Sequence, residues 1–218
     1  MTLKLLLFDL DGTLVDTVKD INSALNFALK PDTSIILSVE ETKNLIGEGI
    51  NRLIEKVLGE EGSGLRDAVT KRFLSYYSEH IADNSIAYPY VGETLETLAG
   101  YKKAVISNKR EQLSRDLLGR LGLLQHFNLI IGSDTTPERK PSAVPVLYAL
   151  SNFKADPEET VIVGDSDYDI EAGRKAGVKT VAVTYGYRER RYLLSADHII
   201  NSFKDLLPVL DIISGEFI

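Results

Sequence analysis

Two aspartates stand two residues apart near the start of the chain, directly after the apolar run Leu5–Phe8. A carboxylate is a competent nucleophile toward phosphorus, provided that a cation screens the repulsion between the two anions. Asp9 closes the apolar run and can be held rigidly there, while Asp11 is placed to protonate a leaving alcohol and then to activate water. The pair therefore predicts phosphoryl transfer, with Asp9 as the nucleophile and Asp11 as the acid and base.

Further along the chain, Ser107, Asn108 and Lys140 are suited to binding the phosphoryl group. Ser107 and Asn108 follow an apolar run and open a helix-like stretch, where hydroxyl, amide and backbone N–H groups together favour an anion. Lys140 can place a point charge on the phosphoryl oxygens. Taken singly, Ser107 or Lys140 is more often an ordinary turn or N-cap residue, so the prediction rests on the clusters together.

An acidic run from Gly164 to Asp169 completes the electrostatics that phosphoryl transfer needs. Magnesium takes oxygen ligands and usually keeps several waters, so two or three carboxyl or carbonyl oxygens are enough to bind it. Asp165 supplies one ligand and Asp9 another, which predicts Mg²⁺ as the cofactor. Asp169 lies one helical turn further on, and we expect it to orient the magnesium waters or to pair with Lys140.

Each cluster follows a short apolar run or lies one loop beyond it. None of the runs alternates with polar residues, which is typical of strands buried on both faces of a parallel sheet. Stretches with apolar residues at three- and four-residue steps lie between the runs and predict helices. This alternation predicts an α/β fold with helices on both faces of the sheet, and ligands bind at the carboxyl ends of such strands. The predicted strands are Leu5–Phe8, Ala104–Ile106, Leu129–Ile131, Val161–Val163, Thr180–Val183 and His198–Ile200, and the helices between them include Glu111–Leu121, Val144–Phe153 and Asp167–Ala176.

The stretch between the first strand and the rest of the sheet has a different pattern. It holds helical patterns over Val18–Leu29, Val39–Leu58 and Leu65–Ile81, and no convincing strand. We therefore predict two domains. The core comprises residues 1–16 and 88–218, and residues 17–87 form a small all-helical cap that lies over one edge of the sheet.

Composition limits the classes of partner. The chain has 218 residues, of which 44% are hydrophobic and 26% charged, with a net charge of −7. These values are typical of a globular protein, and the acidic balance disfavours nucleic acid and anionic membranes as partners. The chain contains no cysteine, which excludes disulfides and thiol chemistry. It shows neither a signal-peptide pattern nor an apolar stretch of about 20 residues, so we expect a cytoplasmic protein that is a monomer or a weak homodimer.

Taken in order, the four clusters resemble the motifs of the haloacid dehalogenase superfamily, specifically its phosphatases. The family opening D-x-D-G-T-L-x-D is matched by residues 9–16, and the second motif, a Ser or Thr after an apolar strand, by Ser107. Lys140-Pro141 matches the third motif, and the run from Gly164 to Asp169 matches the fourth, G-D-x-x-x-D. The resemblance covers almost the whole chain and implies a Rossmann-like core with a helical cap inserted after the first motif.

The resemblance also implies roles for the matching positions. Asp9 is then the nucleophile, and Asp11 is the acid and base with its backbone carbonyl on the magnesium. Asp165 is a magnesium ligand, while Ser107 and Lys140 bind the phosphoryl group. The supporting residues are Thr13, Gly164 and Asp169, while Asn108 belongs with the phosphate-binding residues.

Within this superfamily the chain looks most like bacterial phosphoglycolate phosphatases, which implies a small phosphate ester as the substrate. The supporting stretches are Ile46-Gly47-Glu48-Gly49 and the segment from Tyr88 to Leu95, where Tyr90 stands in place of the family's usual glycine. A cap that closes over the site excludes bulk water and selects the leaving group. The cap residues expected to contact the substrate are Lys43, Glu48, Gly49 and Arg52, of which Lys43 and Arg52 could meet an anionic tail such as a carboxylate.

Two alternatives stay open at this point. A phosphosugar mutase of the same superfamily would keep Asp9 and Asp11 and return the phosphoryl group to its substrate. The two aspartates of the fourth motif favour hydrolysis, since such mutases often carry Glu-Asp there. A catalytically silent binding protein on the same fold is the other alternative, but every chemical position carries a competent residue.

Overall fold

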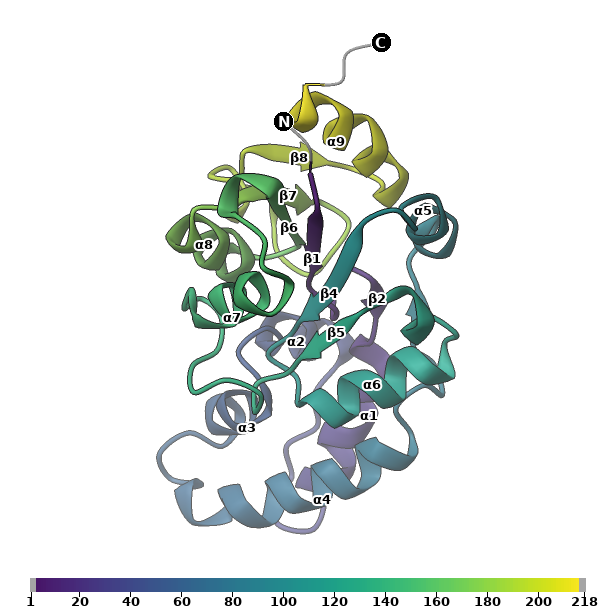
Figure 1. Cartoon of the computed structure of the whole chain (residues 1–218). Coiled ribbons are helices and arrows are strands. Elements are labelled where there is room, and N and C mark those ends of the chain that lie inside the picture. Colours follow the sequence, from purple (N-terminus) through teal and green to yellow (C-terminus); the bar gives the residue numbers. More distant parts are fainter. Residues whose placement is uncertain (1–2, 216–218) are drawn as a thin grey trace.

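The computed structural model describes residues 3–215, and a six-stranded parallel sheet forms the centre of this part of the chain (Figure 1). The strand order is β5-β4-β1-β6-β7-β8, and each neighbouring pair is parallel. The strands are β1 (Leu5–Phe8), β4 (Lys102–Ile106), β5 (Leu129–Ile131), β6 (Thr160–Gly164), β7 (Lys179–Val183) and β8 (His198–Ile200). The predicted strands are thus all present, with bounds that differ by two residues at most.

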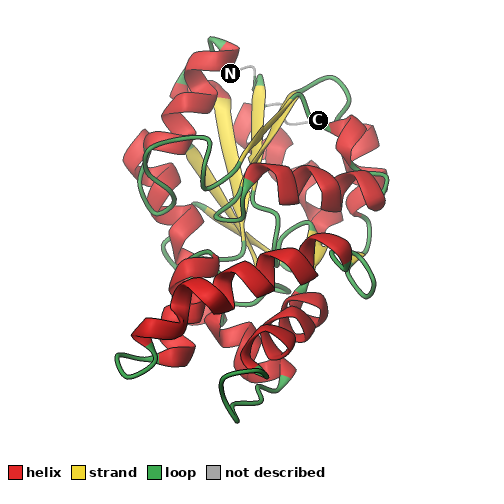
Figure 2. Ribbon diagram, turned by 90° about the horizontal axis from the view of Figure 1, so that it is seen from below, coloured by secondary structure: helices red, strands yellow, loops and turns green. Residues whose placement is uncertain are grey.

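Helices cover both faces of the sheet (Figure 2). Successive side chains of β1 enter different cores, because residues alternate between the two faces of a strand. Leu5 and Leu7 pack with α7 (Val144–Phe153) and α8 (Asp167–Ala176). Leu6 and Phe8 pack on the opposite face, whose helices are α5 (Val91–Thr97), α6 (Glu111–Arg120) and α9 (Leu206–Ser214). The predicted α/β class with a Rossmann-like parallel sheet is therefore confirmed.

Four α-helices lie between β1 and α5, within residues 17–87, and we name these residues the cap. They lie together beyond one end of the sheet (Figure 1). The cap helices are α1 (Val18–Leu29), α2 (Val39–Leu45), α3 (Ile50–Leu58) and α4 (Arg66–Glu79). At the junction, the short strand β2 (Val15–Asp16) pairs antiparallel with β3 (Ile86–Ala87), a strand that the sequence did not indicate. The assignment of residues 17–87 to a separate domain stays a prediction.

The expected helix Val39–Leu58 is two helices in the structure. The chain leaves the helical conformation between Ile46 and Gly49, where Gly47 has φ 125° and Gly49 has φ 79°. Glycine adopts such positive φ values without the clash that a Cβ atom would cause. The break directs this loop back toward the sheet.

The remaining short elements are 3₁₀ turns, and Tyr90 marks the return of the chain to the core. Tyr90 has φ 68°, so the residue that replaces the expected glycine keeps a left-handed conformation.

Within residues 3–215, no helix combines the length and the apolarity that crossing a lipid bilayer requires. The 3₁₀ turns are Ser63–Leu65, Leu124–His126, Pro157–Glu159, Arg190–Tyr192 and Phe203–Asp205.

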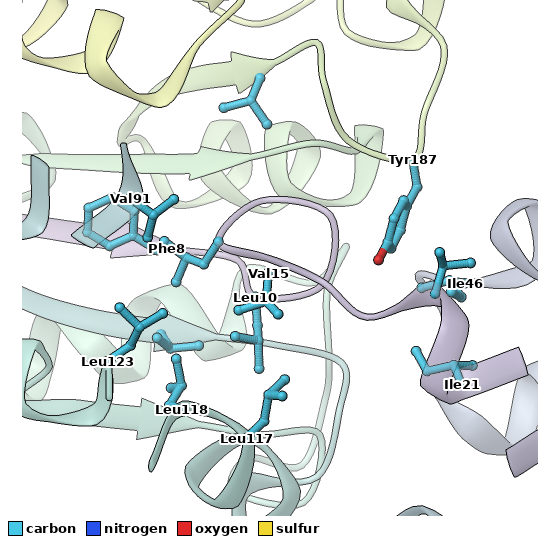
Figure 3. Close-up of a cluster of buried hydrophobic side chains, with 14 of the residues drawn as sticks. Phe8, Leu10, Val15, Ile21, Ile46, Val91, Leu117, Leu118, Leu123 and Tyr187 are labelled. Carbon is cyan, nitrogen blue, oxygen red and sulfur yellow. The ribbon is translucent and has the colours of Figure 1, made fainter. Parts of the chain in front are cut away.

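One hydrophobic cluster is continuous between the cap and the core. Figure 3 shows Tyr187, from the loop after β7, beside Ile21 and Ile46 of the cap, with Leu10 of the loop after β1 and Val15 of β2 nearby. All five side chains are buried. This packing holds the cap against the carboxyl ends of the strands, where the polar clusters lie.

Candidate active site

Three chemically important residues come directly after three neighbouring strands. Asp9 follows β1, Ser107 follows β4, and Asp165 follows β6. Since β1 pairs with both of the other strands and all three are parallel, their carboxyl ends meet at one edge of the sheet. The strand order also diverges at β1, first toward β5 and then toward β8, and open α/β sheets bind ligands at such a point.

A cavity of about 80 Å³ lies between this edge and the cap. Its floor is polar, with carboxylates, a hydroxyl, an amide and two lysines, whereas most of the cap side chains above it are apolar. The core residues of the lining include Asp9, Asp11, Ser107, Asn108, Lys109, Lys140 and Asp165, and the cap residues are Ile21, Ile46, Gly47, Gly49, Ile50, Leu53, Phe73 and Tyr77. The cavity therefore suits a small ligand with a strongly charged end.

Lys140 connects two aspartates at the base of the cavity. Its Nζ atom lies 2.6 Å from Oδ1 of Asp9 and 2.6 Å from Oδ1 of Asp169. Burial by itself lowers the pKa of Lys140, but the carboxylates of Asp169 and Asp9 more than offset it, so the pKa is raised and the side chain stays charged. Asp169 also accepts hydrogen bonds from the backbone N–H and hydroxyl of Ser166, at 3.1 and 2.5 Å. The expected pairing of Asp169 with Lys140 is present.

Three buried carboxylates gather around this lysine. Oxygens of Asp9, Asp165 and Asp169 all lie within 4.8 Å of one another. Burial raises the pKa of Asp9 well above its ordinary value, as do the neighbouring carboxylates, although Lys140 opposes the change. Burial and Asp169 likewise raise the pKa of Asp165 to about 7, against the hydrogen bond that the backbone N–H of Tyr187 donates to it at 2.6 Å. The protein alone therefore leaves this cluster short of positive charge.

This donor set fits a hard divalent cation. It consists of carboxylate oxygens, with no sulfur or imidazole in the cluster, and such ligands suit Mg²⁺ or Ca²⁺ rather than zinc or copper. A cation there would also supply the positive charge that balances the carboxylates of Asp9, Asp165 and Asp169. The buried triad can therefore bind a metal.

Two glycines allow the carboxylates to approach the backbone closely. A Cβ atom on Gly164 would collide with the side chain of Asp169, and one on Gly12 would collide with the carboxylate of Asp165. Gly12 also has φ 90°, a conformation that other residues adopt only with strain. Thr13, beside it, donates a hydrogen bond to Oδ1 of Asp165 at 3.4 Å. Gly164 and Thr13 thus lie where the sequence analysis expected supporting residues.

The carboxylate of Asp11 is held apart from the triad. Its Oδ1 atom accepts a 2.6 Å hydrogen bond from the hydroxyl of Thr17 and pairs with Nζ of Lys109. Asp9 and Asp11 therefore have different partners, although only one residue separates them. The side chain of Asp11 faces the cavity, while the third carboxylate near the predicted metal position belongs to Asp169.

Ser107 and Asn108 lie together at the end of β4, as expected. The hydroxyl of Ser107 accepts a hydrogen bond from the backbone N–H of Lys109 at 3.2 Å, which leaves its proton free to be donated into the cavity. Nδ2 of Asn108 donates to the carbonyl oxygens of Gly47 and Lys140, at 2.8 and 3.0 Å. Asn108 therefore contacts the cap loop as well as the cavity.

Of the four cap residues expected near the substrate, only Gly49 lines the cavity. Arg52 is 45% exposed and pairs with Glu55 and Glu48, while Glu48 also pairs with Lys56. Lys43 does not line the cavity. The structure does not bring Lys43, Glu48 and Arg52 together with the catalytic cluster. For Arg52 the reason is that α3 directs its apolar face to the cavity and its charged face to solvent, whereas Lys43 lies on α2 and Glu48 in the loop before α3.

Three cavity residues were not identified from the sequence as site residues. Lys109 pairs with Asp11, Tyr187 contacts Asp165 through its backbone N–H, and Arg188 donates to the carbonyl oxygens of Asn44 and Ile46. Lys109 stands two residues after Ser107, and this proximity was the one available signal. Tyr187 and Arg188 follow β7 in a loop whose approach to the site depends on the tertiary fold.

Comparison with known proteins gives a consistent result. The family model of the haloacid dehalogenase-like hydrolases matches residues 6–183. A phosphoglycolate phosphatase of Aquifex aeolicus is 40% identical over 220 residues, covering 96% of this chain and 97% of that protein. One from Chromobacterium violaceum is 37% identical, covering 95% and 96%. The crystal structure of a predicted phosphoglycolate phosphatase from Haemophilus somnus superposes with a TM-score of 0.89 at 32% identity, covering 96% of this chain and 99% of that one.

Proposed function

The chain belongs to the haloacid dehalogenase-like hydrolases and is a phosphatase, and we propose that it hydrolyses a small phosphate monoester, such as phosphoglycolate, through an aspartyl-phosphate on Asp9 with Mg²⁺ as the cofactor. The observation that carries this proposal is the arrangement around Asp9. A buried carboxylate lies at the floor of a small cavity, within reach of a lysine, a serine hydroxyl and two further carboxylates.

In the first half of the reaction, the free oxygen of Asp9 attacks phosphorus and the bond from phosphorus to the ester oxygen breaks. Oδ1 of Asp9 is the oxygen that Lys140 holds, which leaves Oδ2 free to attack. Asp11 acts as the general acid in this step and gives a proton to the departing alkoxide. The products of this step are an alcohol and the phosphorylated side chain of Asp9.

In the second half, a water molecule attacks the aspartyl-phosphate. Asp11, now a carboxylate, accepts the proton of that water, and Asp9 and inorganic phosphate are released. The hydrogen bond from Thr17 fixes Asp11 on the cavity side of the loop, so one carboxylate serves both steps. Water supplies the oxygen that binds phosphorus and the proton that returns to Asp11, so the cycle is balanced.

The residues that would hold Mg²⁺ are Asp9 and Asp165 through their carboxylates and Asp11 through its backbone carbonyl. When bound, the ion screens the repulsion between the attacking carboxylate and the phosphoryl oxygens. Lys140 and Ser107 contribute a positive charge and a hydroxyl donor on the other side of the phosphoryl group. Asp169 keeps Lys140 in place, since Ser166 fixes the other oxygen of Asp169.

The cap supports the choice of a small substrate. We propose that residues 17–87 act as a cap domain on a core of residues 1–16 and 88–218, and that the cap excludes bulk water from the aspartyl-phosphate. The cavity of about 80 Å³ suits a metabolite better than a phosphoprotein or a nucleic acid. The relatives named phosphoglycolate phosphatase support phosphoglycolate as the first ester to test.

Phosphate release from a panel of esters tests this proposal. The panel comprises phosphoglycolate, 2-hydroxyethyl phosphate, glucose 6-phosphate, glucose 1-phosphate and a phosphopeptide, each with Mg²⁺ and with chelator. We expect phosphate release from the small-molecule esters and not from the phosphopeptide, and only with Mg²⁺. Interconversion of the glucose phosphates without phosphate release would instead identify a mutase, and no turnover of any ester would identify a binding protein.

A further inference from the structure

Lys109 is a cation in the cavity that the proposed reaction does not use. Its side chain is 7% exposed and pairs with Asp11. Its Nζ atom also lies 5.2 Å from the centre of the Tyr77 ring, which belongs to the cap helix α4. Burial by itself lowers the pKa of Lys109, but Asp11 and Tyr77 raise it, so the ammonium stays charged. An ammonium has three donors, and Asp11 is the one carboxylate among its described partners.

The other cations that line the cavity either contact other groups of the protein or are exposed to solvent. Lys140 is held between two aspartates. The guanidinium of Arg188 donates to the carbonyl oxygens of Asn44 and Ile46 in the cap, at 3.3 and 3.0 Å, and lies 3.9 Å from Oδ1 of Asp167. Arg110 is exposed to solvent. Lys109 is therefore the buried cation of this cavity with capacity for a further anion.

The surroundings of Lys109 restrict where a second negative charge can bind. The cap wall consists largely of Ile21, Ile50, Leu53 and Phe73, none of which can compensate a charge. A carboxylate buried against such a wall without a cation would lose its hydration and gain nothing in return. A negatively charged leaving group therefore finds a buried positive charge in this cavity at Lys109.

The chemistry of the leaving group points to the same place. In the phosphate ester of a 2-hydroxy acid, the carboxylate carbon is two bonds from the ester oxygen. That oxygen must lie beside Asp11, which protonates it, and Lys109 contacts Asp11 directly. The carboxylate of such an ester is thus delivered next to the ammonium of Lys109.

We propose that Lys109 determines substrate specificity by binding the carboxylate of the leaving group, so that the enzyme selects phosphate esters of small hydroxy acids over esters of neutral alcohols. This inference rests on the proposed function. Lys109 stays protonated throughout and transfers no proton. Its ammonium binds the substrate carboxylate either beside Asp11 or in place of Asp11. Thr17 keeps Asp11 in place during this change of partners.

Two esters of nearly equal size isolate this contact. They are 2-phosphoglycolate and 2-hydroxyethyl phosphate, which differ in carrying a carboxylate or a neutral CH₂OH group. For the wild type, we expect kcat/KM to be at least about 10-fold higher for phosphoglycolate, mainly through KM. Lys109→Met should lower kcat/KM for phosphoglycolate by about 100-fold and for the neutral ester by only a few-fold. Lys102→Met, which removes the same charge from an exposed position at the other end of β4, should keep the wild-type preference.

Three results would overturn the inference. Equal losses on both esters in Lys109→Met would mean that Lys109 only positions Asp11. Hydrolysis of both esters by the wild type without preference would also overturn it, and that result needs no variant and leaves the proposed function intact. If the wild type hydrolysed neither ester with Mg²⁺, the proposed function itself would fail, and the inference with it. Lys109→Arg provides the rescue, since it keeps the charge and should retain the preference for phosphoglycolate.

Discussion

Nζ of Lys140 lies 2.6 Å from Oδ1 of Asp9, although the two residues are 131 positions apart in the chain. The lysine occupies one carboxylate oxygen and leaves the other free. Because Lys140 is also paired with Asp169, its position does not depend on Asp9 alone. The relationship therefore combines a fixed nucleophile with a positive charge that remains when the carboxylate reacts.

Removing the charge of the nucleophile should abolish turnover while the fold persists. In Asp9→Asn, the amide oxygen can still accept a hydrogen bond from Lys140, but the amide cannot attack phosphorus. We expect kcat to fall by at least about 1,000-fold, with a thermal midpoint within a few degrees of the wild type. Steady-state phosphate release and thermal unfolding measure the two quantities. Activity within 10-fold of the wild type would contradict the assignment of the nucleophile.

Metal binding can be tested without turnover. A cation that binds only the folded protein raises its thermal midpoint as its concentration increases. We expect Mg²⁺ to stabilise the wild type but not Asp165→Ala, because Asp165 belongs to the buried carboxylate triad. Asp167→Ala is the matched control, since the side chain of Asp167 is 47% exposed and lies outside that triad. Equal responses of the two variants to Mg²⁺ would argue against Asp165 as a ligand.

The raised pKa of Asp165 predicts a pH dependence of stability in metal-free protein. Its pKa rises from 3.8 to about 7 on folding, so the folded state holds this proton more tightly. The stabilisation is fully present below about pH 4 and is lost as the pH rises through 7. With chelator present, the thermal midpoint of the wild type should therefore fall more between pH 5.5 and 8 than that of Asp165→Asn, by an amount on the order of a few degrees. Asp211→Asn, at an exposed position on α9, should follow the wild type.

The hydroxyl of Tyr187 joins the loop after β7 to the start of the cap. It accepts a 2.7 Å hydrogen bond from the backbone N–H of Thr17 and donates one to Asp16 at 3.0 Å. Tyr187→Phe removes the partner of the buried N–H of Thr17 and one partner of the half-buried carboxylate of Asp16, which should lower the free energy of unfolding by about 1–3 kcal/mol. Denaturant titration measures this change, with Tyr192→Phe, 48% exposed, as the control. A loss of stability no larger than in the control would mean that water replaces the hydroxyl.

The sequence by itself determined the fold class and the main chemical positions. The apolar run Leu5–Phe8 has the bounds of the observed strand β1, because continuous burial on both faces leaves a local signature. In a parallel sheet the residue after each strand lies at one edge, so Asp9, Ser107 and Asp165 were expected to meet. These inferences needed only local patterns and one general property of sheets.

The tertiary structure decided which partner each charged group has. The sequence placed Arg52 in the substrate shell, but the angle of α3 turns it toward Glu48 and Glu55. It gave no role to Lys109, whose contact with Asp11 spans 98 residues. The direction of a long side chain depends on how helices and loops pack, and that packing is a property of the whole chain. Residue types and spacing therefore specify the chemistry available, and only the folded structure decides which of those groups meet.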